Sequence, residues 1–219
     1  MKPIEDYSFI RGVCHGFWPN FSEERLRREM SYCKRLNINS IRFWLSQEEY
    51  EKNGEKYLDI IEKFMGICFE FGVNSMPILW NGNFITEFEE PDELFYKKAK
   101  IYAEKVIYRF CDKPYLLMWD VINEPMCNDY MNKSPENEKI VRFEKLKKHI
   151  RHLLLIVKDI DSENCITIGH EQVWHCESTV DLVDVISYHD YLSTRKAIEG
   201  AILEAYRMKT GNIAGSERK

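Results

Sequence analysis

Short apolar runs alternate with longer amphipathic stretches along the whole of this 219-residue chain. The apolar runs predict strands at residues 9–14, 39–45, 73–80, 115–121, 165–169, 182–187 and 212–216. The amphipathic stretches predict a helix that opens at Ser22 and further helices over residues 57–71, 91–111, 137–160 and 194–208. Strands that alternate with helices build right-handed βαβ units around a parallel sheet. We therefore expect an α/β fold of about seven units, with residues 1–219 as a single domain because no linker interrupts the pattern.

Two kinds of α/β fold fit this order, an open doubly wound sheet and a closed barrel. No expected strand is followed by the G-x-G-x-x-G loop of the dinucleotide-binding fold. Polar pairs instead follow successive strands, at Asn123-Glu124, His170-Glu171 and His189-Asp190. Barrel enzymes build their sites at this carboxyl end of the strands. The sequence therefore favours a TIM-type (β/α) barrel.

Composition excludes several classes of partner. The 31 basic and 36 acidic residues are interspersed and give a net charge of −5, which is a poor match to nucleic acid. Seven cysteines without a C-x-x-C pair argue against a disulfide framework and a zinc site. The chain has no apolar run of the ~18 residues that a membrane span requires, and its N-terminus does not resemble a signal peptide. We expect a cytoplasmic protein that binds no membrane.

Glu124 carries the clearest chemical signal. It ends an apolar strand, so its carboxyl group is expected at the mouth of the barrel against apolar neighbours. Desolvation raises the pKa of a carboxyl group, and a general acid must hold its proton near neutral pH. Asn123 can donate its amide to a substrate hydroxyl. The alternative interpretation is that Glu124 only caps the segment that follows.

The heptapeptide Trp-Asp-Val-Ile-Asn-Glu-Pro at residues 119–125 resembles the fourth-strand motif of the retaining glycosidase clan that includes family 5 cellulases and β-mannanases. Arg42 matches that clan's second-strand arginine, and His189 and Tyr191 match the histidine and tyrosine that end its sixth strand. The resemblance covers essentially the whole chain. It implies that Glu124 is the acid/base, that Asn123 contacts the sugar 2-hydroxyl, and that the other three residues orient substrate and nucleophile.

The chain departs from this clan near its end. The clan's nucleophile is a Glu that ends the seventh strand, and Glu217 lies in the matching place after a short, polar strand. An eighth strand does not follow before Lys219. We interpret the chain as a barrel truncated before strand 8, with closure by a partner chain or a minimal barrel as the alternatives. The oligomeric state is left open.

Further side chains that follow strands are candidate sugar contacts. Trp80 and Trp174, like Trp18, can stack on pyranose rings, although partly buried packing is the more common role for tryptophan. Asn81 lies before a Gly that also suits a simple turn. His170 is a possible substrate contact, and its spacing of five from His175 does not fit the i, i+4 pattern of a zinc motif. No metal or other cofactor is predicted.

These signals predict a retaining β-glycoside hydrolase acting on oligo- or polysaccharides. The first alternative is an inactive fragment that retains at most carbohydrate binding. The second is another barrel enzyme, a lyase or an aldolase, which would use a strand-end lysine as a Schiff base, and no such lysine is found. The sequence does not specify the sugar, because loop shape sets specificity in this fold.

Overall fold

The computed structural model describes residues 6–16, 19–82 and 93–210 of the chain. Six strands follow in order: β1 (Gly12–His15), β2 (Ser40–Trp44), β3 (Asn74–Asn81), β4 (Trp119–Asn123), β5 (Ile166–His170) and β6 (Ser187–Tyr188). The helices are α1 (Glu23–Arg35), α2 (Gln47–Asn53), α3 (Glu55–Glu70), α4 (Glu93–Phe110), α5 (Asp129–Asn132), α6 (Lys139–Ile160) and α7 (Arg195–Thr210), with a 3₁₀ helix η1 (Val173–Ser178).

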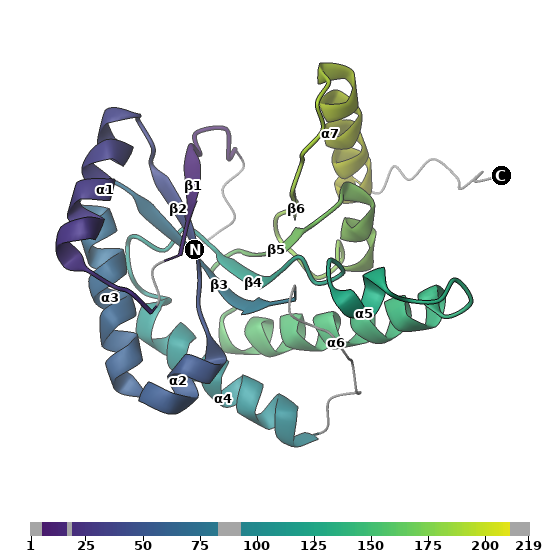
Figure 1. Cartoon of the computed structure of the whole chain (residues 1–219), viewed down its shortest axis with the longest axis horizontal. Coiled ribbons are helices and arrows are strands. Elements are labelled where there is room, and N and C mark those ends of the chain that lie inside the picture. Colours follow the sequence, from purple (N-terminus) through teal and green to yellow (C-terminus); the bar gives the residue numbers. More distant parts are fainter. Residues whose placement is uncertain (1–5, 17–18, 83–92, 211–219) are drawn as a thin grey trace.

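All six strands are parallel and lie in sequence order, β1-β2-β3-β4-β5-β6. The sheet curls, with α1, α3, α4 and α6 along its outer side and α7 beyond β6 (Figure 1). This is an incomplete (β/α) barrel, as the alternation of the sequence predicted. The expected seventh strand at residues 212–216 lies outside the described residues.

Local signals that the sequence provides are confirmed at the helix ends. Ser22 caps α1, accepting the backbone N–H of Arg25 on its hydroxyl at 3.3 Å. Gly72 follows the end of α3 with a φ of +78°, a conformation that glycine adopts without strain. The sequence missed α2, which begins after a second serine cap at Ser46.

Two predicted strands lie differently from their expected positions. The fourth begins at Trp119 rather than at residue 115, because residues 115–118 make only an isolated bridge between Leu116 and Ser75. The sixth contains only Ser187 and Tyr188. Its expected first half forms turns, and there Asp184 accepts the backbone N–H of Ile166 at 3.0 Å. Apolar composition alone does not separate a strand from a buried loop.

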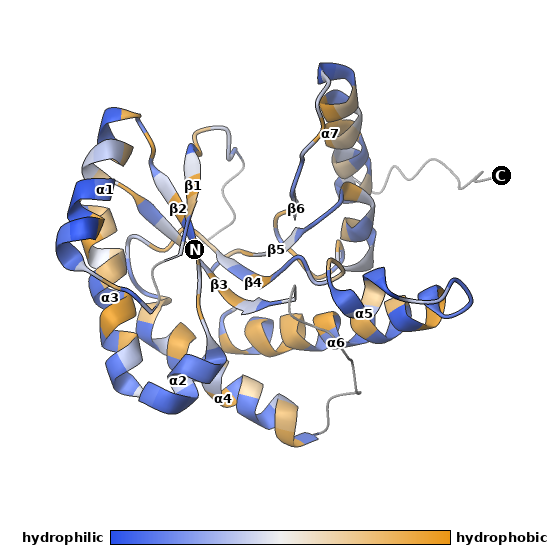
Figure 2. Ribbon diagram, in the orientation of Figure 1, coloured by the Kyte–Doolittle hydropathy of each residue, from blue (hydrophilic) through white to orange (hydrophobic). Residues whose placement is uncertain are grey.

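The core lies between the sheet and its outer helices. Phe43 of β2 packs against Phe64 of α3 with ring centroids 4.7 Å apart, and both side chains are fully buried. The helices are two-sided, with apolar faces toward the sheet and polar faces outward (Figure 2). No helix in the described part of the chain is long and apolar enough to cross a membrane.

A buried hydrogen bond between Trp119 and Asp161 links two elements of this core. The fully buried Trp119 donates its indole N–H to Asp161 at 2.9 Å. Burial acts to raise the pKa of Asp161, but hydrogen bonds from Asn164, Trp119 and the Glu163 backbone together lower it. The carboxylate therefore fastens the start of β4 to the loop that precedes β5.

Two buried histidines make the fold sensitive to acid. Burial lowers the pKa of His149 on α6 and of His170 on β5 to about 4, from an ordinary value of 6.5. The folded state keeps both neutral, whereas the unfolded chain binds protons below pH 6.5. Stability is therefore fully present above pH 6.5 and is lost as the pH falls toward 4. Each histidine accounts for a loss of about 1.4 kcal/mol between pH 7.5 and 5.5.

Urea unfolding at these two pH values tests this expectation. Between pH 7.5 and pH 5.5, the loss of unfolding free energy in His149→Gln should be roughly half the loss in the wild-type chain. Lys145→Gln, an exposed change on the same helix, should leave the loss as it is. An unchanged pH dependence in His149→Gln would contradict the assignment.

Candidate active site

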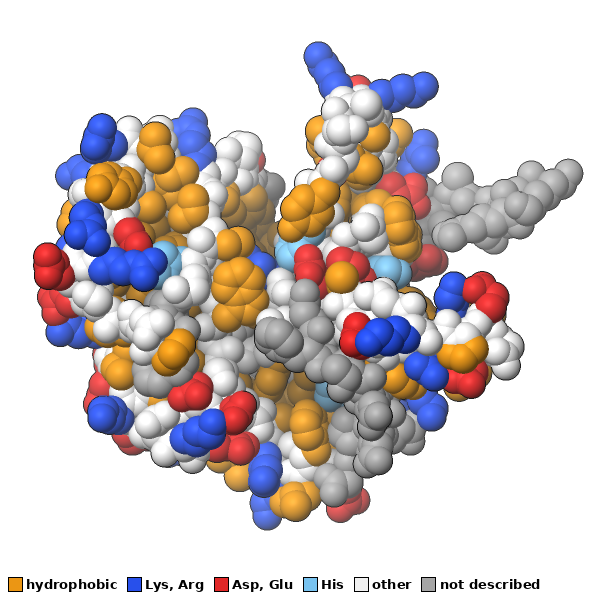
Figure 3. Space-filling view, in the orientation of Figure 1, with side chains coloured by type: hydrophobic (Ala, Val, Ile, Leu, Met, Phe, Trp, Pro, Cys, Tyr) orange, Lys and Arg blue, Asp and Glu red, His pale blue; other side chains and the backbone are white. Residues whose placement is uncertain are grey.

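An open cavity of about 570 Å³ lies at the carboxyl ends of the strands. Its lining comes from β1, β2, β3, β4 and the segment after β6: Cys14, Arg42, Trp44, Asn81, Asn123, Glu124, His189, Asp190 and Tyr191. Histidine and acidic side chains border a hollow on the face shown in Figure 3. Six of the ten residues that the sequence singled out are thereby brought together around one space.

The floor of this cavity is an ion pair. Arg42 donates its Nε–H to Asp120 Oδ2 at 2.8 Å, and its Nη2 lies 2.6 Å from the same oxygen. Asp120 is fully buried and also accepts the backbone N–H of Gly169 at 3.1 Å. Burial raises the pKa of the Asp120 carboxyl, and Arg42 and the Gly169 N–H oppose that rise. The guanidinium is thus fixed in position, and the Asp120 carboxylate balances its charge.

An irregularity in β4 adds Asn123 to the same network. Asp120 and Asn123 are three residues apart, so in a regular strand they would face opposite sides of the sheet. Against β5, Asp120 pairs with Thr167 and Asn123 with Gly169, so three steps on β4 oppose two on β5. Asn123 therefore accepts a hydrogen bond from Arg42 Nη2 at 2.8 Å and donates one to Asn81 at 3.2 Å. A bulge of this kind re-aims a side chain next to a site.

Gly169 makes room for the network. A Cβ atom at this position would lie 2.6 Å from Arg42 Nη2, 3.0 Å from His189 Nε2 and 3.1 Å from Asp120 Oδ2. Any side chain at residue 169 would therefore displace the Arg42 guanidinium. The absence of a side chain at Gly169 is a condition for the ion pair beneath the cavity.

Glu124 has a strained backbone, with a φ of +43° that side-chain-bearing residues rarely adopt. Neighbouring strands hold it there. Its N–H donates to the Gly169 carbonyl at 2.8 Å, and the Gly82 N–H donates to the Asn123 carbonyl at 2.8 Å. A Cβ on Gly82 would lie only 2.4 Å from Pro125 Cα, so the two loops can meet only because residue 82 is glycine. The strained residue is therefore the one whose carboxylate faces the cavity.

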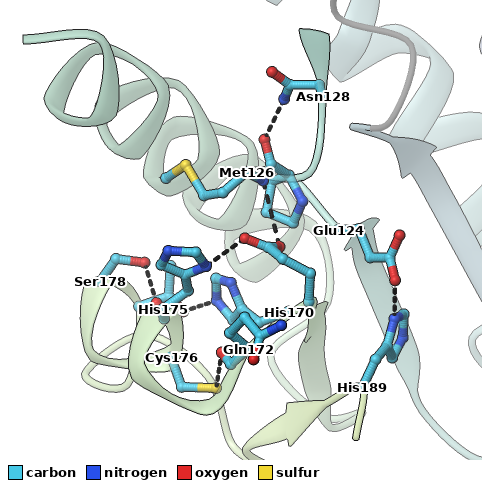
Figure 4. Close-up of polar contacts among 12 residues, drawn as sticks. Glu124, Met126, Asn128, His170, Gln172, His175, Cys176, Ser178 and His189 are labelled. Carbon is cyan, nitrogen blue, oxygen red and sulfur yellow. Dashed lines mark hydrogen bonds and ion pairs between the residues drawn. The ribbon is translucent and has the colours of Figure 1, made fainter. Parts of the chain in front are cut away.

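The carboxylate of Glu124 and the imidazole of His189 point toward one another, with Oε1 in contact with Nδ1 (Figure 4). Both side chains are mostly buried, at 15% and 20% exposure. Such a pair can share one proton, held on the carboxyl group or on the imidazole. It gives Glu124 a fixed orientation and a neighbour that stabilises either protonation state.

The turn after Glu124 is held by a second cluster, which lies to one side of the Glu124–His189 pair in Figure 4. Glu171 accepts the Met126 backbone N–H at 3.4 Å and forms an ion pair with His175 of η1. Asn128 donates its amide to the Pro125 carbonyl at 2.8 Å. Burial and the nearby carboxylates of Glu124 and Glu171 raise the pKa of the Cys127 thiol. These contacts fix the chain as it leaves β4.

Three of the predicted site residues that the structure describes are not part of the cavity lining. Trp80 faces the other side of β3, where it donates to Gln47 at 2.9 Å and packs against Tyr102. His170 is 1% exposed, and its Nε2 is bonded to Thr179 at 2.9 Å. Trp174 is 53% exposed on η1. Glu217 lies outside the described residues, as does Trp18.

Sequence reasoning assigned no role in the site to four residues that matter here: Cys14, Trp44, Asp120 and Asp190. Trp44 and Arg42 are two apart on β2 and so share a face, and the guanidinium lies 5.6 Å from the indole centroid. Strand alternation could thus have identified Trp44. Asp120 lay within the quoted heptapeptide, but the bulge that joins it to Asn123 leaves no signal in the sequence.

Comparison with solved structures finds the same fold in known enzymes. GH5_18 from Streptomyces cattleya, solved with GlcNAc, has a TM-score of 0.66 at 12% identity, over 83% of this chain and 51% of its own. A β-glucuronidase from Bacteroides uniformis has a TM-score of 0.65 at 14% identity, over 90% and 23%. A β-glucuronidase from Parabacteroides merdae has 0.58 at 18%, over 92% and 22%. The fold is that of the barrel glycosidases.

At these identities the similarity shows the fold alone. The chain spans about half of the Streptomyces protein and less than a quarter of the two β-glucuronidases. No family model matches the sequence, and no curated protein matches it.

The space around Gly169 is open to a direct test. Gly169→Ala should lower the free energy of unfolding by about 1–3 kcal/mol, because the added methyl group overpacks against the Arg42 guanidinium. Gly200→Ala is the matched control on α7, where a Cβ meets nothing within 4 Å. That change should be neutral or stabilise by up to about 1 kcal/mol. Chemical denaturation measures both, and equal values would contradict the packing described.

Proposed function

We propose that this chain is a retaining β-glycoside hydrolase of the family 5 type, with Glu124 as its acid/base. The single observation that carries the proposal is the cavity in which Glu124, Asn123, Arg42 and His189 meet at the carboxyl ends of parallel strands. Barrel enzymes place their chemistry at this face. The glycosidase fold of the similar structures supports the same class.

The proposed reaction begins with protonated Glu124, whose proton passes to the leaving oxygen as the glycosidic bond breaks. A second carboxylate attacks the anomeric carbon and forms a glycosyl-enzyme. Glu124, now ionised, then removes a proton from the water that hydrolyses this intermediate. Glu217 is our candidate for the second carboxylate. In such enzymes the two carboxyl groups lie about 5–5.5 Å apart.

The neighbouring side chains have roles that follow from their contacts. His189 touches Glu124 Oε1 and can accept or return the shared proton as the carboxyl group changes state. Asn123, held by Arg42, keeps its amide beside Asn81 at the sugar-facing end of β4. Trp44 offers an aromatic face, which suits the apolar face of a pyranose. Tyr191, 88% exposed at the rim, is available for a leaving-group sugar.

The names of the similar proteins leave two kinds of sugar open. GH5_18 is solved with GlcNAc and with Manβ1-4GlcNAc, which are neutral, whereas a β-glucuronidase is named for a uronic acid. Both remain candidate substrates for the cavity as far as the fold is concerned. The alternative function is carbohydrate binding without turnover.

Glu124→Gln tests the proposed role of the acid/base. With a 4-nitrophenyl β-glycoside panel, kcat/KM should fall about 10²–10⁴-fold, the range for loss of a general acid/base. A 2,4-dinitrophenyl leaving group needs no acid, so its glycosyl-enzyme should still form and then accumulate. Azide needs no base and should restore turnover, giving a β-glycosyl azide as the retaining route requires.

Glu24→Gln removes the same group from an exposed position on α1 and should leave turnover unchanged. Unaltered turnover in Glu124→Gln would contradict the assignment of Glu124 as the acid/base. A folded wild-type chain that binds glycosides and never cleaves them would favour the binding-only alternative.

A further inference from the structure

The charge of the cavity depends on how Arg42 is used. Arg42 is the one lysine or arginine among the described residues that line the cavity. Its Nε and Nη2 both contact Asp120, and Nη2 also donates to Asn123. A third contact goes to the side chain of Cys14. The guanidinium is therefore committed to protein partners, and its charge is offset by the buried carboxylate.

The other ionisable groups of the lining leave a negative excess. Glu124 is in contact with His189, so that pair is neutral or negative unless two protons are bound. Asp190 stands at the mouth of the cavity, exposed to solvent. Its Oδ1 accepts the backbone N–H of Leu192 at 2.7 Å, which holds the carboxylate in place. Arg195, the next basic residue along the chain, is paired with Glu199 on α7 at 2.7 Å.

A uronic acid would bring a carboxylate into this space and find no uncommitted cation among the described lining residues. Recognition of a carboxylate calls for a free guanidinium, an ammonium or a set of N–H donors. Like charges placed close together oppose binding. The hydroxymethyl group of a neutral sugar meets no such opposition.

We propose that the cavity selects neutral sugars over uronic acids, and that Asp190 is the residue that sets this selection. The inference rests on the proposed function, since it assumes that the cavity is a sugar site. It goes beyond the fold comparison, which leaves both kinds of sugar open. Asp190 acts through its charge at the mouth and takes no part in the bond-breaking step.

Binding, rather than turnover, tests this selection. The ligands are phenyl 1-thio-β-D-glucoside and phenyl 1-thio-β-D-glucuronide, whose thioglycosidic bond resists hydrolysis and which differ only at C6. The matching thiogalactoside and thiogalacturonide form a second pair. Titration calorimetry on the full chain at low salt should give at least about tenfold tighter binding of the neutral member of one pair. Raising the salt concentration to about 0.5 M should reduce the ratio of the two dissociation constants, because screening weakens the repulsion from the exposed Asp190 carboxylate.

Asp190→Asn should also reduce the ratio of the uronide's dissociation constant to that of the neutral sugar several-fold, mainly because the uronide binds more tightly. Asp159→Asn removes the same charge from an exposed position on α6, outside the cavity, and should leave the ratio as it is. Equal or tighter binding of the uronides, or no binding of either member of both pairs, would overturn the selection. Failure of the proposed function is read separately, from unaltered turnover in Glu124→Gln, so the two results are distinguishable.

Discussion

The buried ion pair between Arg42 and Asp120 is the interaction on which the candidate site depends. Removing two charges from water is costly, and an ion pair this deep persists only with close geometry and further hydrogen bonds. Both conditions are met, because Asp120 also accepts the Gly169 N–H and Arg42 also donates to Asn123. Strands β2, β4 and β5 are thereby joined on the inner side of the sheet, with β3 lying between the first two.

The pair sets the position of the groups above it. Asn123 reaches Arg42 only through the bulge in β4, and that bulge directly precedes the strained backbone of Glu124. Gly82 and Gly169 supply the space and hydrogen bonds that hold the strained residue. Strain of this kind survives where the surrounding structure over-determines it, and it is concentrated at functional sites. The cavity is therefore rigid at its floor, with its exposed side chains, Asp190 and Tyr191, at the rim.

Much of this could be predicted from the sequence. The alternation of apolar and amphipathic stretches predicted the parallel α/β architecture, and the polar residues after the strands indicated the correct edge of the sheet. Six predicted side chains line one cavity because the carboxyl ends of parallel strands meet there. The role of Glu124 and the identity of the nucleophile stay predictions.

The failures have physical causes that single residues illustrate. Gly169 faces Arg42, so its neighbour His170 must face the opposite side of β5, where it bonds Thr179. Asn81 and Trp80 are adjacent on β3, and only Asn81 faces the cavity. Strict use of strand alternation would have separated these residues. It would also have misplaced Asn123, because a bulge breaks the alternation without a signal in the sequence.

A double-mutant cycle on the buried pair tests its central role most directly. Free energies of unfolding would be measured for Asp120→Asn, Arg42→Met and the combination. Each single change leaves an unpaired buried charge or acceptor and should cost about 3–5 kcal/mol, whereas the double change should cost no more than the larger single one. If the two costs simply add, the pair is not coupled, and the account of how this site is held fails.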